Sequence, residues 1–275
     1  MKIGKVRILE ELGKSAGSRV YRVRRKEDSL EYALKVVPCD NRRAQRYLNQ
    51  VRNEYRIGSY LKHPNIIEIY CLEIEEGWFS GPKKANLLTQ FVPGRTMDRL
   101  PLLPISMLLR VFERIASAVT HMHARGVIHA DLKPNNLILD AGADVKIIDF
   151  GIAQLRGEHL DHIYATREFM APETGTLKLI NERTDIYSFG ATMYRLTTLQ
   201  MPFPILTAVL KGEREFEQNY VPANAVNPRI PAELSDLIGE CLSYRPDHRP
   251  KSMEELEKAL SQMARSSGNK PWSDE

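Results

Sequence analysis

The stretch GVIHADLKPNNLILD, residues 126–140, decides how this sequence is interpreted. An acid, a lysine and two asparagines stand close together in a short polar segment that lies between two apolar runs. Pro134 fixes its own φ angle and stiffens the segment, so that several polar side chains can be aimed at one point. Asp131, Lys133 and Asn136 are therefore predicted to share one site.

The composition is that of an ordinary globular protein. Of the 275 residues, 43% are hydrophobic and 27% are charged, which excludes the disordered and fibrous classes. The length allows one large domain or two coupled lobes. No apolar run reaches the roughly 18 residues that span a bilayer, and the start MKIGKVRILEELG does not read as a signal peptide. We therefore expect a cytoplasmic protein with no membrane segment in this chain.

Positive charge is concentrated near the start of the chain. The net charge is +4, and arginines gather in YRVRRKED, residues 21–28, and DNRRAQRYLNQVR, residues 40–52. Few aromatic residues alternate with them as base stacking would require, so a solvated face is predicted and no nucleic-acid partner is expected. Cys39, Cys71 and Cys241 are far apart and odd in number, which predicts free thiols.

Residues 1–92 show the pattern of a small sheet with one helix. Alternating apolar residues predict strands over 7–13, 18–25, 31–37, 65–76 and 86–92, the last two flanking a Gly-Pro loop at 81–82. Apolar spacing of three and four predicts a helix over 42–61.

Residues 93–265 are predicted to form a larger and mostly helical part. Helical patterns cover 104–126, which ends at the stop signal Gly126, and also 183–198, 232–242 and 252–265. Residues 266–275 form a polar tail that is expected to fray.

Lys35 is a lone cation at the end of the apolar strand segment YALK, and burying it unpaired would be costly, so it needs an anionic partner. Together with HADLKPNN (129–136), KIIDFG (146–151), ATREFMAPE (165–173) and TDIYSFG (184–190), this segment gives the chain a clear resemblance. Over roughly residues 7–262 the chain resembles the eukaryotic-like serine/threonine protein kinases, of the type without arginine before the catalytic aspartate.

The resemblance implies an α+β, bilobal fold, with a small antiparallel five-stranded lobe that carries one main helix and a larger, mostly helical lobe. It implies an enzyme that transfers the γ-phosphate of ATP, with Mg²⁺, to serine and threonine hydroxyls of protein substrates. It also implies that Lys35 contacts the nucleotide phosphates and pairs with Glu54. Asp131 would then orient the substrate hydroxyl and accept its proton, while Lys133 steadies the γ-phosphate.

The resemblance further implies that Asn136 and Asp149 are the magnesium ligands, and their oxygen atoms suit this hard cation. Thr166 matches the threonine typical of serine/threonine kinases. The implied adenine and phosphate site is made by Gly13, Val20, Ala33, Lys35, Thr89, Gln90, Val92 and Ile138. Three structural charges are also implied, a pair between Glu173 and Arg249 and an Asp185 that holds the backbone of the catalytic loop.

The sequence departs from the kinase pattern at the glycine loop and in the helix. GKSAGSRV, residues 13–20, has Ser15 and Ser18 where the pattern has glycine, and Gly17 is out of register, which puts nucleotide affinity in question. Gly58 stands in a helix position where large apolar residues are usual. A mid-helix glycine costs roughly 1 kcal/mol, and it is expected to leave a hole and to loosen the helix that carries Glu54.

Ala130 is the third departure, because many kinases have an arginine there that binds a phosphate on the activation segment. Between Gly151 and Ala171 the only hydroxyl side chains are Tyr164 and Thr166. The arginine is thus absent, and so are most candidate phosphorylation sites of the activation segment. Because these two absences agree, we predict that this chain does not use a phosphate there as its switch.

Three other interpretations stay open at this point. A catalytically weak or inactive kinase-like scaffold that binds protein partners is the main alternative, and a small-molecule phosphotransferase is a weaker one. His159, Asp161 and His162 could bind a metal, although a polar loop is the simpler interpretation because no fourth ligand is implied.

Overall fold

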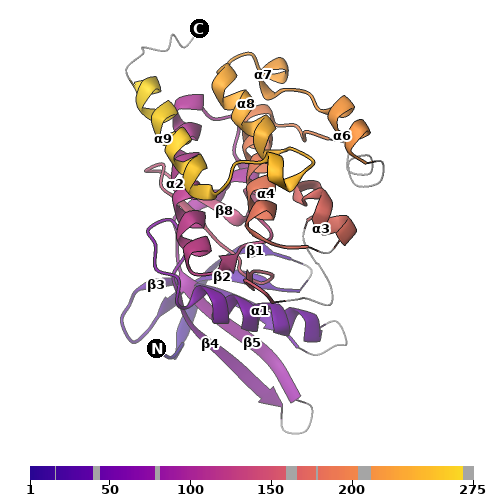
Figure 1. Ribbon diagram of the computed structural model, residues 1–275. Coiled ribbons are helices and arrows are strands. Elements are labelled where there is room, and N and C mark those ends of the chain that lie inside the picture. Colours follow the sequence, from indigo (N-terminus) through magenta and orange to yellow (C-terminus); the bar gives the residue numbers. More distant parts are fainter. Residues whose placement is uncertain are drawn as a thin grey trace. The chain divides into compact units, whose positions relative to one another are not determined.

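The structure is a computed structural model that describes residues 1–15, 17–39, 44–77, 81–158, 166–177, 179–203 and 212–268. The chain forms two compact units, and their elements can be followed in Figure 1. The first unit contains Met1–Pro93 and also Ile148–Ala153, and the second contains Gly94–Ile147 and the described residues from Gln154 onward. The segment that begins with Ile148 therefore packs with residues that precede it by more than fifty positions.

The first unit contains a five-stranded antiparallel sheet, as predicted. Its strands are β1 (Val6–Lys14), β2 (Arg19–Arg25), β3 (Glu31–Pro38), β4 (Ile69–Gly77) and β5 (Gly81–Gln90), in the spatial order β1-β2-β3-β5-β4. Tyr32, Leu34 and Leu88 are buried on the sheet together with Val23, and form part of an apolar cluster.

Two predicted strand boundaries are wrong. The Gly-Pro loop expected at 81–82 belongs to β5, where Gly81 lies opposite Gly77 and Pro82 opposite Glu76. The strand expected from residue 65 begins only at Ile69, because residues 63–66 form a turn that the Ile66 N–H closes on the His63 carbonyl at 3.0 Å.

Helix α1 (Ala44–Gly58) is the single helix of the first unit among the described residues. Leu48, Val51 and Ile57 are at most 2% exposed, and this apolar side of α1 packs against β3, β4 and β5. The helix was predicted over 42–61. It ends three residues earlier, at Gly58, and residues 42 and 43 lie outside the described part of the chain.

The second unit is mostly helical, as predicted. Its α-helices are α2 (Ile105–Ala124), α3 (Pro172–Leu177), α4 (Glu182–Thr198), α6 (Glu213–Asn219), α7 (Ala223–Val226), α8 (Ala232–Cys241) and α9 (Met253–Gly268). Short 3₁₀ helices are η1 (Met97–Arg99), η2 (Pro134–Asn136), η3 (Arg167–Phe169) and η4 (Pro246–His248). The short strands are β6 (Gly94–Thr96), β7 (Val127–Ile128), β8 (Leu137–Asp140), β9 (Val145–Ile147) and β10 (Gln154–Leu155).

Helix α4 is the centre of the second unit. Almost all of its residues from Thr184 to Thr197 are buried, and it packs against α2 and α8. Helix α2 packs against α9 and is followed by Gly126, whose φ of 71° is the left-handed stop that the sequence predicts. Helix α9 continues to Gly268, three residues beyond the predicted end of this helix at residue 265, and residues 269–275 lie outside the described part.

The arginines of residues 21–28 are ion-paired. Arg22 and Arg24 both contact Glu31 at 2.6 Å, and Arg25 lies 2.9 Å from Asp28. This pairing agrees with the prediction of a solvated charged face. The three cysteines are free thiols, as predicted. Within the described ranges, no helix is both long enough and apolar enough to cross a membrane.

Candidate active site

In the first unit, Lys35 has the anionic partner that its strand position requires. Its Nζ lies 2.6 Å from Glu54 Oε2, on α1, and 3.7 Å from Asp149 Oδ1. Burial lowers the pKa of Lys35, but the charges of Asp149 and Glu54 outweigh burial and raise it, so Lys35 stays protonated. Burial raises the pKa of Glu54 to about 7, although Lys35 opposes that shift. The predicted pair between Lys35 and Glu54 is confirmed.

One face of the sheet carries most of the residues implied for the nucleotide. Direct cross-strand partners share a face, and Val20 lies opposite both Gly13 and Lys35, while Ala33 lies opposite Thr89. Ala33 and Lys35 are two residues apart on β3 and therefore also share that face. The strand register thus brings these five residues, the cation Lys35 among them, together on one face of the sheet.

The remaining candidates for the nucleotide site lie elsewhere. Gln90 is the last residue of β5 and is half-buried, and Val92, which follows it, is 8% exposed. Ile138 is a half-buried residue of β8 in the second unit, opposite Thr96 and Lys146.

In the second unit, the predicted polar residues of the quoted stretch converge on Asp131. Lys133 Nζ lies 2.6 Å from Asp131 Oδ2, and the amide nitrogen of Asn136 donates to the Asp131 carbonyl at 2.8 Å and to Oδ2 at 3.1 Å. Thr166 joins this group, because its Oγ1 accepts a bond of 2.6 Å from Lys133 and its N–H donates to Asp131 Oδ1 at 3.1 Å. Pro134 opens the 3₁₀ helix η2, which brings Asn136 back over the aspartate.

The structural charges are placed as the resemblance implies. Asp185 on α4 is fully buried and accepts bonds of 2.8 Å from the backbone N–H groups of His129 and Ala130. His123 on α2 also bonds Asp185, at 2.8 Å. These bonds fix the backbone on the N-terminal side of Asp131, so the prediction that Asp185 holds the catalytic loop is confirmed.

The predicted pair of Glu173 with Arg249 is also confirmed. The guanidinium makes two parallel bonds to the carboxylate, of 2.7 and 2.8 Å, and both side chains are at most 5% exposed. Arg249 also donates to the Ser243 carbonyl, and it lies 5.0 Å from the centre of the Tyr187 ring. The pair ties α3, which carries Glu173, to the segment between α8 and α9.

The comparison with known proteins decides the family. Residues 6–261 match the sequence profile of the protein kinase domain. The chain belongs to the protein kinase family.

Three relatives illustrate the similarity of this kinase domain to known proteins. Serine/threonine-protein kinase PrkC of Bacillus subtilis is 27% identical over 92% of the chain, and serine/threonine-protein kinase Pkn1 of Myxococcus xanthus is 26% identical over 94%. The chain spans only 40% and 38% of their lengths. Aurora kinase C of Mus musculus is 29% identical over 86% of the chain and 84% of its own length.

The glycine loop of this kinase domain is closed by its own serine hydroxyls. Ser15 Oγ accepts bonds from the N–H groups of Ser18 at 3.1 Å and Gly17 at 3.4 Å, and lies 2.9 Å from Ser18 Oγ. Gly17 is needed here, because a Cβ on it would lie 2.3 Å from the Tyr47 ring of α1. Two amides of the loop are therefore satisfied internally.

The expectation for Gly58 is wrong. Gly58 is the last residue of α1, and no hole surrounds it, because a Cβ there would lie 2.4 Å from Ile69 Cδ1 and 2.9 Å from Phe150 Cδ2. Phe150 is fully buried. The missing side chain lets Ile69 and Phe150 approach the helix closely, so Gly58 tightens the packing beside Asp149.

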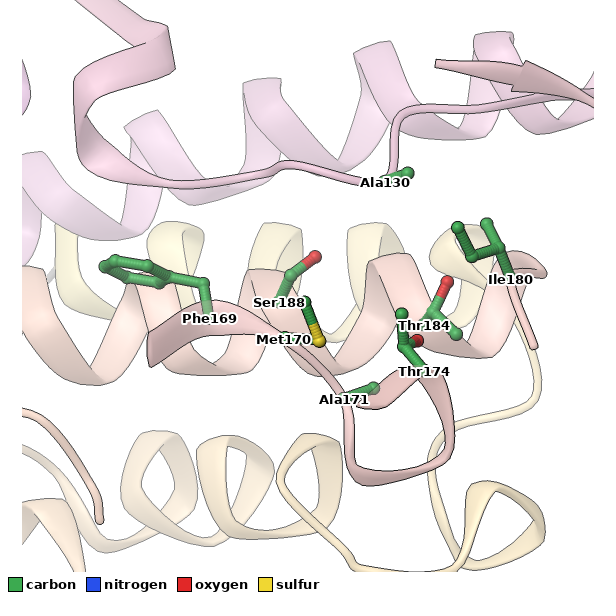
Figure 2. A pocket seen from close by; sticks show the side chains of 8 residues that line it. All are labelled: Ala130, Phe169, Met170, Ala171, Thr174, Ile180, Thr184 and Ser188. Carbon is green, nitrogen blue, oxygen red and sulfur yellow. The ribbon is translucent and has the colours of Figure 1, made fainter. Parts of the chain in front are cut away.

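Ala130 has a left-handed backbone, with a φ of 64°. Figure 2 shows it at a pocket that is also lined by residues of the segment 169–180 and of α4. Three lining hydroxyls already donate to backbone carbonyls, Thr174 to Leu179, Thr184 to Asn181 and Ser188 to Asp185. None of the eight lining residues is acidic, so an arginine at position 130 would meet no carboxylate among them.

Some sequence predictions fall outside the described residues, namely the group of His159, Asp161 and His162, and the hydroxyl of Tyr164. The absence of a phosphate switch beside Ala130 therefore stays a prediction.

Asn53 and His123 were not singled out from the sequence. Asn53 contacts three carbonyls of the segment that follows Asp149, and His123 contacts Asp185. The only local signal for Asn53 is that it directly precedes Glu54 on a helix. The only local signal for His123 is that it lies three residues before Gly126, the glycine that ends the predicted helix.

Proposed function

We propose that this chain is a serine/threonine protein kinase, which transfers the γ-phosphate of ATP to serine and threonine hydroxyls of protein substrates. The observation that carries the proposal is Lys133, whose Nζ lies 2.6 Å from both Asp131 Oδ2 and Thr166 Oγ1. A cation that binds a carboxylate and a hydroxyl at the same time fixes the position of both groups. The carboxylate is then held in a defined place, where a substrate hydroxyl can approach it.

Asp131 is proposed to orient the substrate hydroxyl and to accept its proton. Its Oδ1 accepts one bond, from Thr166, and its Oδ2 accepts bonds from Lys133 and Asn136. An ionised carboxylate has about four acceptor positions, so a substrate hydroxyl can still be accepted. Lys133 is well placed to stabilise negative charge that develops on the transferred group.

Lys35 is proposed to bind the nucleotide phosphates, with Glu54 as the residue that holds its Nζ in position. Because Lys35 stays protonated, it offers a permanent cation beside the sheet face that carries Gly13, Val20, Ala33 and Thr89. We assign that face to the nucleotide, together with Gln90, Val92 and Ile138. ATP is the nucleotide that the family uses.

Asn136 and Asp149 fit a magnesium ion by their chemistry. The side chain of Asp149 is 45% exposed and can reach a cation from solvent. Asn136 uses its amide nitrogen for Asp131, which leaves its amide oxygen as the atom that can ligate. Carboxylate and amide oxygens are the ligands that Mg²⁺ prefers, and the bound ion would neutralise charge on the phosphates. We propose these two residues as its protein ligands.

The relatives support serine and threonine as acceptors, because PrkC and Pkn1 are both described as serine/threonine-protein kinases. The part of the chain that the structure describes offers no observation that favours an inactive scaffold or a small-molecule phosphotransferase. The location in the cytoplasm and the absence of a nucleic-acid partner stay predictions from the sequence.

The test uses the purified chain with Mg-ATP and peptide libraries that offer serine, threonine or tyrosine. We expect phosphate on serine and threonine, detected by mass spectrometry. Asp131→Asn should abolish transfer while nucleotide binding, measured by calorimetry, is kept. Asp144→Asn is the matched control, since Asp144 is a 63% exposed acid of the same unit that pairs with Arg114. Transfer that survives Asp131→Asn, or that occurs only on tyrosine, would contradict the proposal.

A further inference from the structure

Asn53 lies on α1 directly before Glu54 and binds the backbone that follows Asp149. Its Nδ2 lies 3.1 Å from the carbonyl oxygen of Phe150, 3.2 Å from that of Gly151 and 2.7 Å from that of Ala153. Three carbonyls thus converge on one amide group. An amide nitrogen has only two hydrogens, so at least one of them is shared between two carbonyls.

The other end of the amide is held by Arg56, one turn later on α1. The guanidinium donates to Asn53 Oδ1 from Nη2 at 2.7 Å and from Nε at 3.2 Å. Because Oδ1 accepts these two bonds, Nδ2 faces the three carbonyls. An oxygen in that place would repel them, so the side chain has only one workable orientation.

The same side of α1 contacts the segment at two more points. A Cβ on Gly151 would lie 3.4 Å from Gln50 Cβ, and a Cβ on Gly58 would lie 2.9 Å from Phe150. Gln50, Asn53, Glu54 and Gly58 follow the spacing of one helix face. A single face of α1 therefore binds Lys35 through Glu54 and also binds the segment 150–153.

Asp149 needs such support, because its backbone is left-handed, with a φ of 67°. That conformation is unfavourable for a residue with a side chain and persists only where the surroundings enforce it. Asp149 Oδ1 also accepts a bond of 3.1 Å from the Gly151 N–H, so a displacement of the turn would move the carboxylate.

We propose that Asn53 is a positioning residue for Asp149. By binding the carbonyls of Phe150, Gly151 and Ala153, its amide fixes the turn and so holds the carboxylate of Asp149 beside Lys35. This inference rests on the proposed function, in which Asp149 ligates magnesium. It also gives the start of the activation segment a fixed conformation without any phosphate, in keeping with Ala130.

The test compares Asn53→Asp with Asn49→Asp in the full chain. Asn49 lies one turn earlier on α1, is exposed, and uses its Oδ1 to accept a bond of 2.9 Å from Gln45, which an aspartate can still accept. Both variants add one negative charge to the same helix, but only Asn53→Asp removes the donor to the three carbonyls.

Two measurements separate a positioning role from a general loss of structure. Calorimetry measures the affinity for ATP with and without MgCl₂, and the ratio of the two affinities gives the gain from magnesium. In Asn53→Asp this ratio should be at least about tenfold smaller than in wild type, while the affinity without magnesium should stay within about threefold of wild type. Hydrogen exchange of the nucleotide-free protein should show faster exchange at Gly151–Ala153. Asn49→Asp should match wild type in both.

Unchanged magnesium dependence together with unchanged exchange in Asn53→Asp would overturn the proposal. An equal loss of affinity with and without magnesium would also overturn it. If Asn53→Asp does not fold, Asn53→Gln takes its place, since it adds no charge but moves the amide by one methylene, and the same losses are expected. A wild-type chain that transfers no phosphate would overturn the proposed function, whereas the exchange measurement still decides whether Asn53 fixes the turn.

Discussion

Replacing Gly58 by alanine sets helix propensity against tertiary packing. Alanine is better than glycine inside a helix by about 1 kcal/mol, so the sequence by itself predicts that Gly58→Ala stabilises the protein. In the structure, the added Cβ would lie 2.4 Å from Ile69 Cδ1 and 2.9 Å from Phe150 Cδ2, well inside van der Waals contact. Ile69 is 3% exposed and Phe150 is fully buried, so neither has much room to move.

Overpacking of this kind costs about 1–3 kcal/mol, and the gain in propensity is smaller at the last residue of a helix. We therefore expect Gly58→Ala to lower the free energy of unfolding by about 1–2 kcal/mol, measured by urea denaturation. Because Phe150 must shift to make room, the affinity for Mg-ATP should also fall.

Ile69→Val tests the cause, since it removes Cδ1, the atom nearest to the new methyl group. Alone it should cost about 0.5–1.5 kcal/mol. In the Ile69→Val background, Gly58→Ala should cost about 1 kcal/mol less than in wild type, because the closest contact is gone. A Gly58→Ala variant more stable than wild type, or an equal cost in both backgrounds, would refute the reasoning.

Three further predictions follow from the site. Burial raises the pKa of Glu54 to about 7, so this carboxyl gains a proton as pH falls through 7 and no longer offers Lys35 a negative charge. The rate of phosphate transfer by wild type, divided by that of Glu54→Gln, should therefore rise between about pH 6 and 8 and then level off. A flat rate ratio would contradict this assignment. Between about pH 4.5, the ordinary pKa of this carboxyl, and about pH 7, the folded protein binds more protons than the unfolded chain, so the contribution of Glu54 to stability falls as pH rises through that range. Replacing Ser15 and Ser18 by glycine frees the two backbone amides that Ser15 Oγ now binds. The affinity for ATP, measured by calorimetry, should then increase by less than about tenfold. A collapse of ATP binding would instead mean that the serine hydroxyls contact the nucleotide. Glu173→Gln leaves the fully buried Arg249 without its anion and should cost about 3–5 kcal/mol in urea unfolding, and a loss below about 1 kcal/mol would contradict the role of the pair.

The order of elements and the main partners of the site could be predicted from the sequence. Period-two and period-3.6 patterns depend on neighbouring residues, so strands such as β2 and β3 and helices such as α4 and α8 lie where the patterns indicate. The resemblance to the kinases also implied that Lys35 pairs with Glu54 and Glu173 with Arg249. A cation on an apolar strand must find an anion, whatever the details of the packing.

Tertiary structure alone decided the features that depend on contacts between distant residues. Gly58 looks like a weak point of a helix, yet it lies against Phe150, which is 92 positions later in the chain. Asn53 was not singled out from the sequence, because its three carbonyl partners are 97–100 residues away. Propensity and periodicity are local, whereas the space around a side chain and the donors it meets are set by which segments the fold brings together. The sequence therefore determined which residues are proposed to carry the chemistry, and the tertiary structure decided what holds them in place.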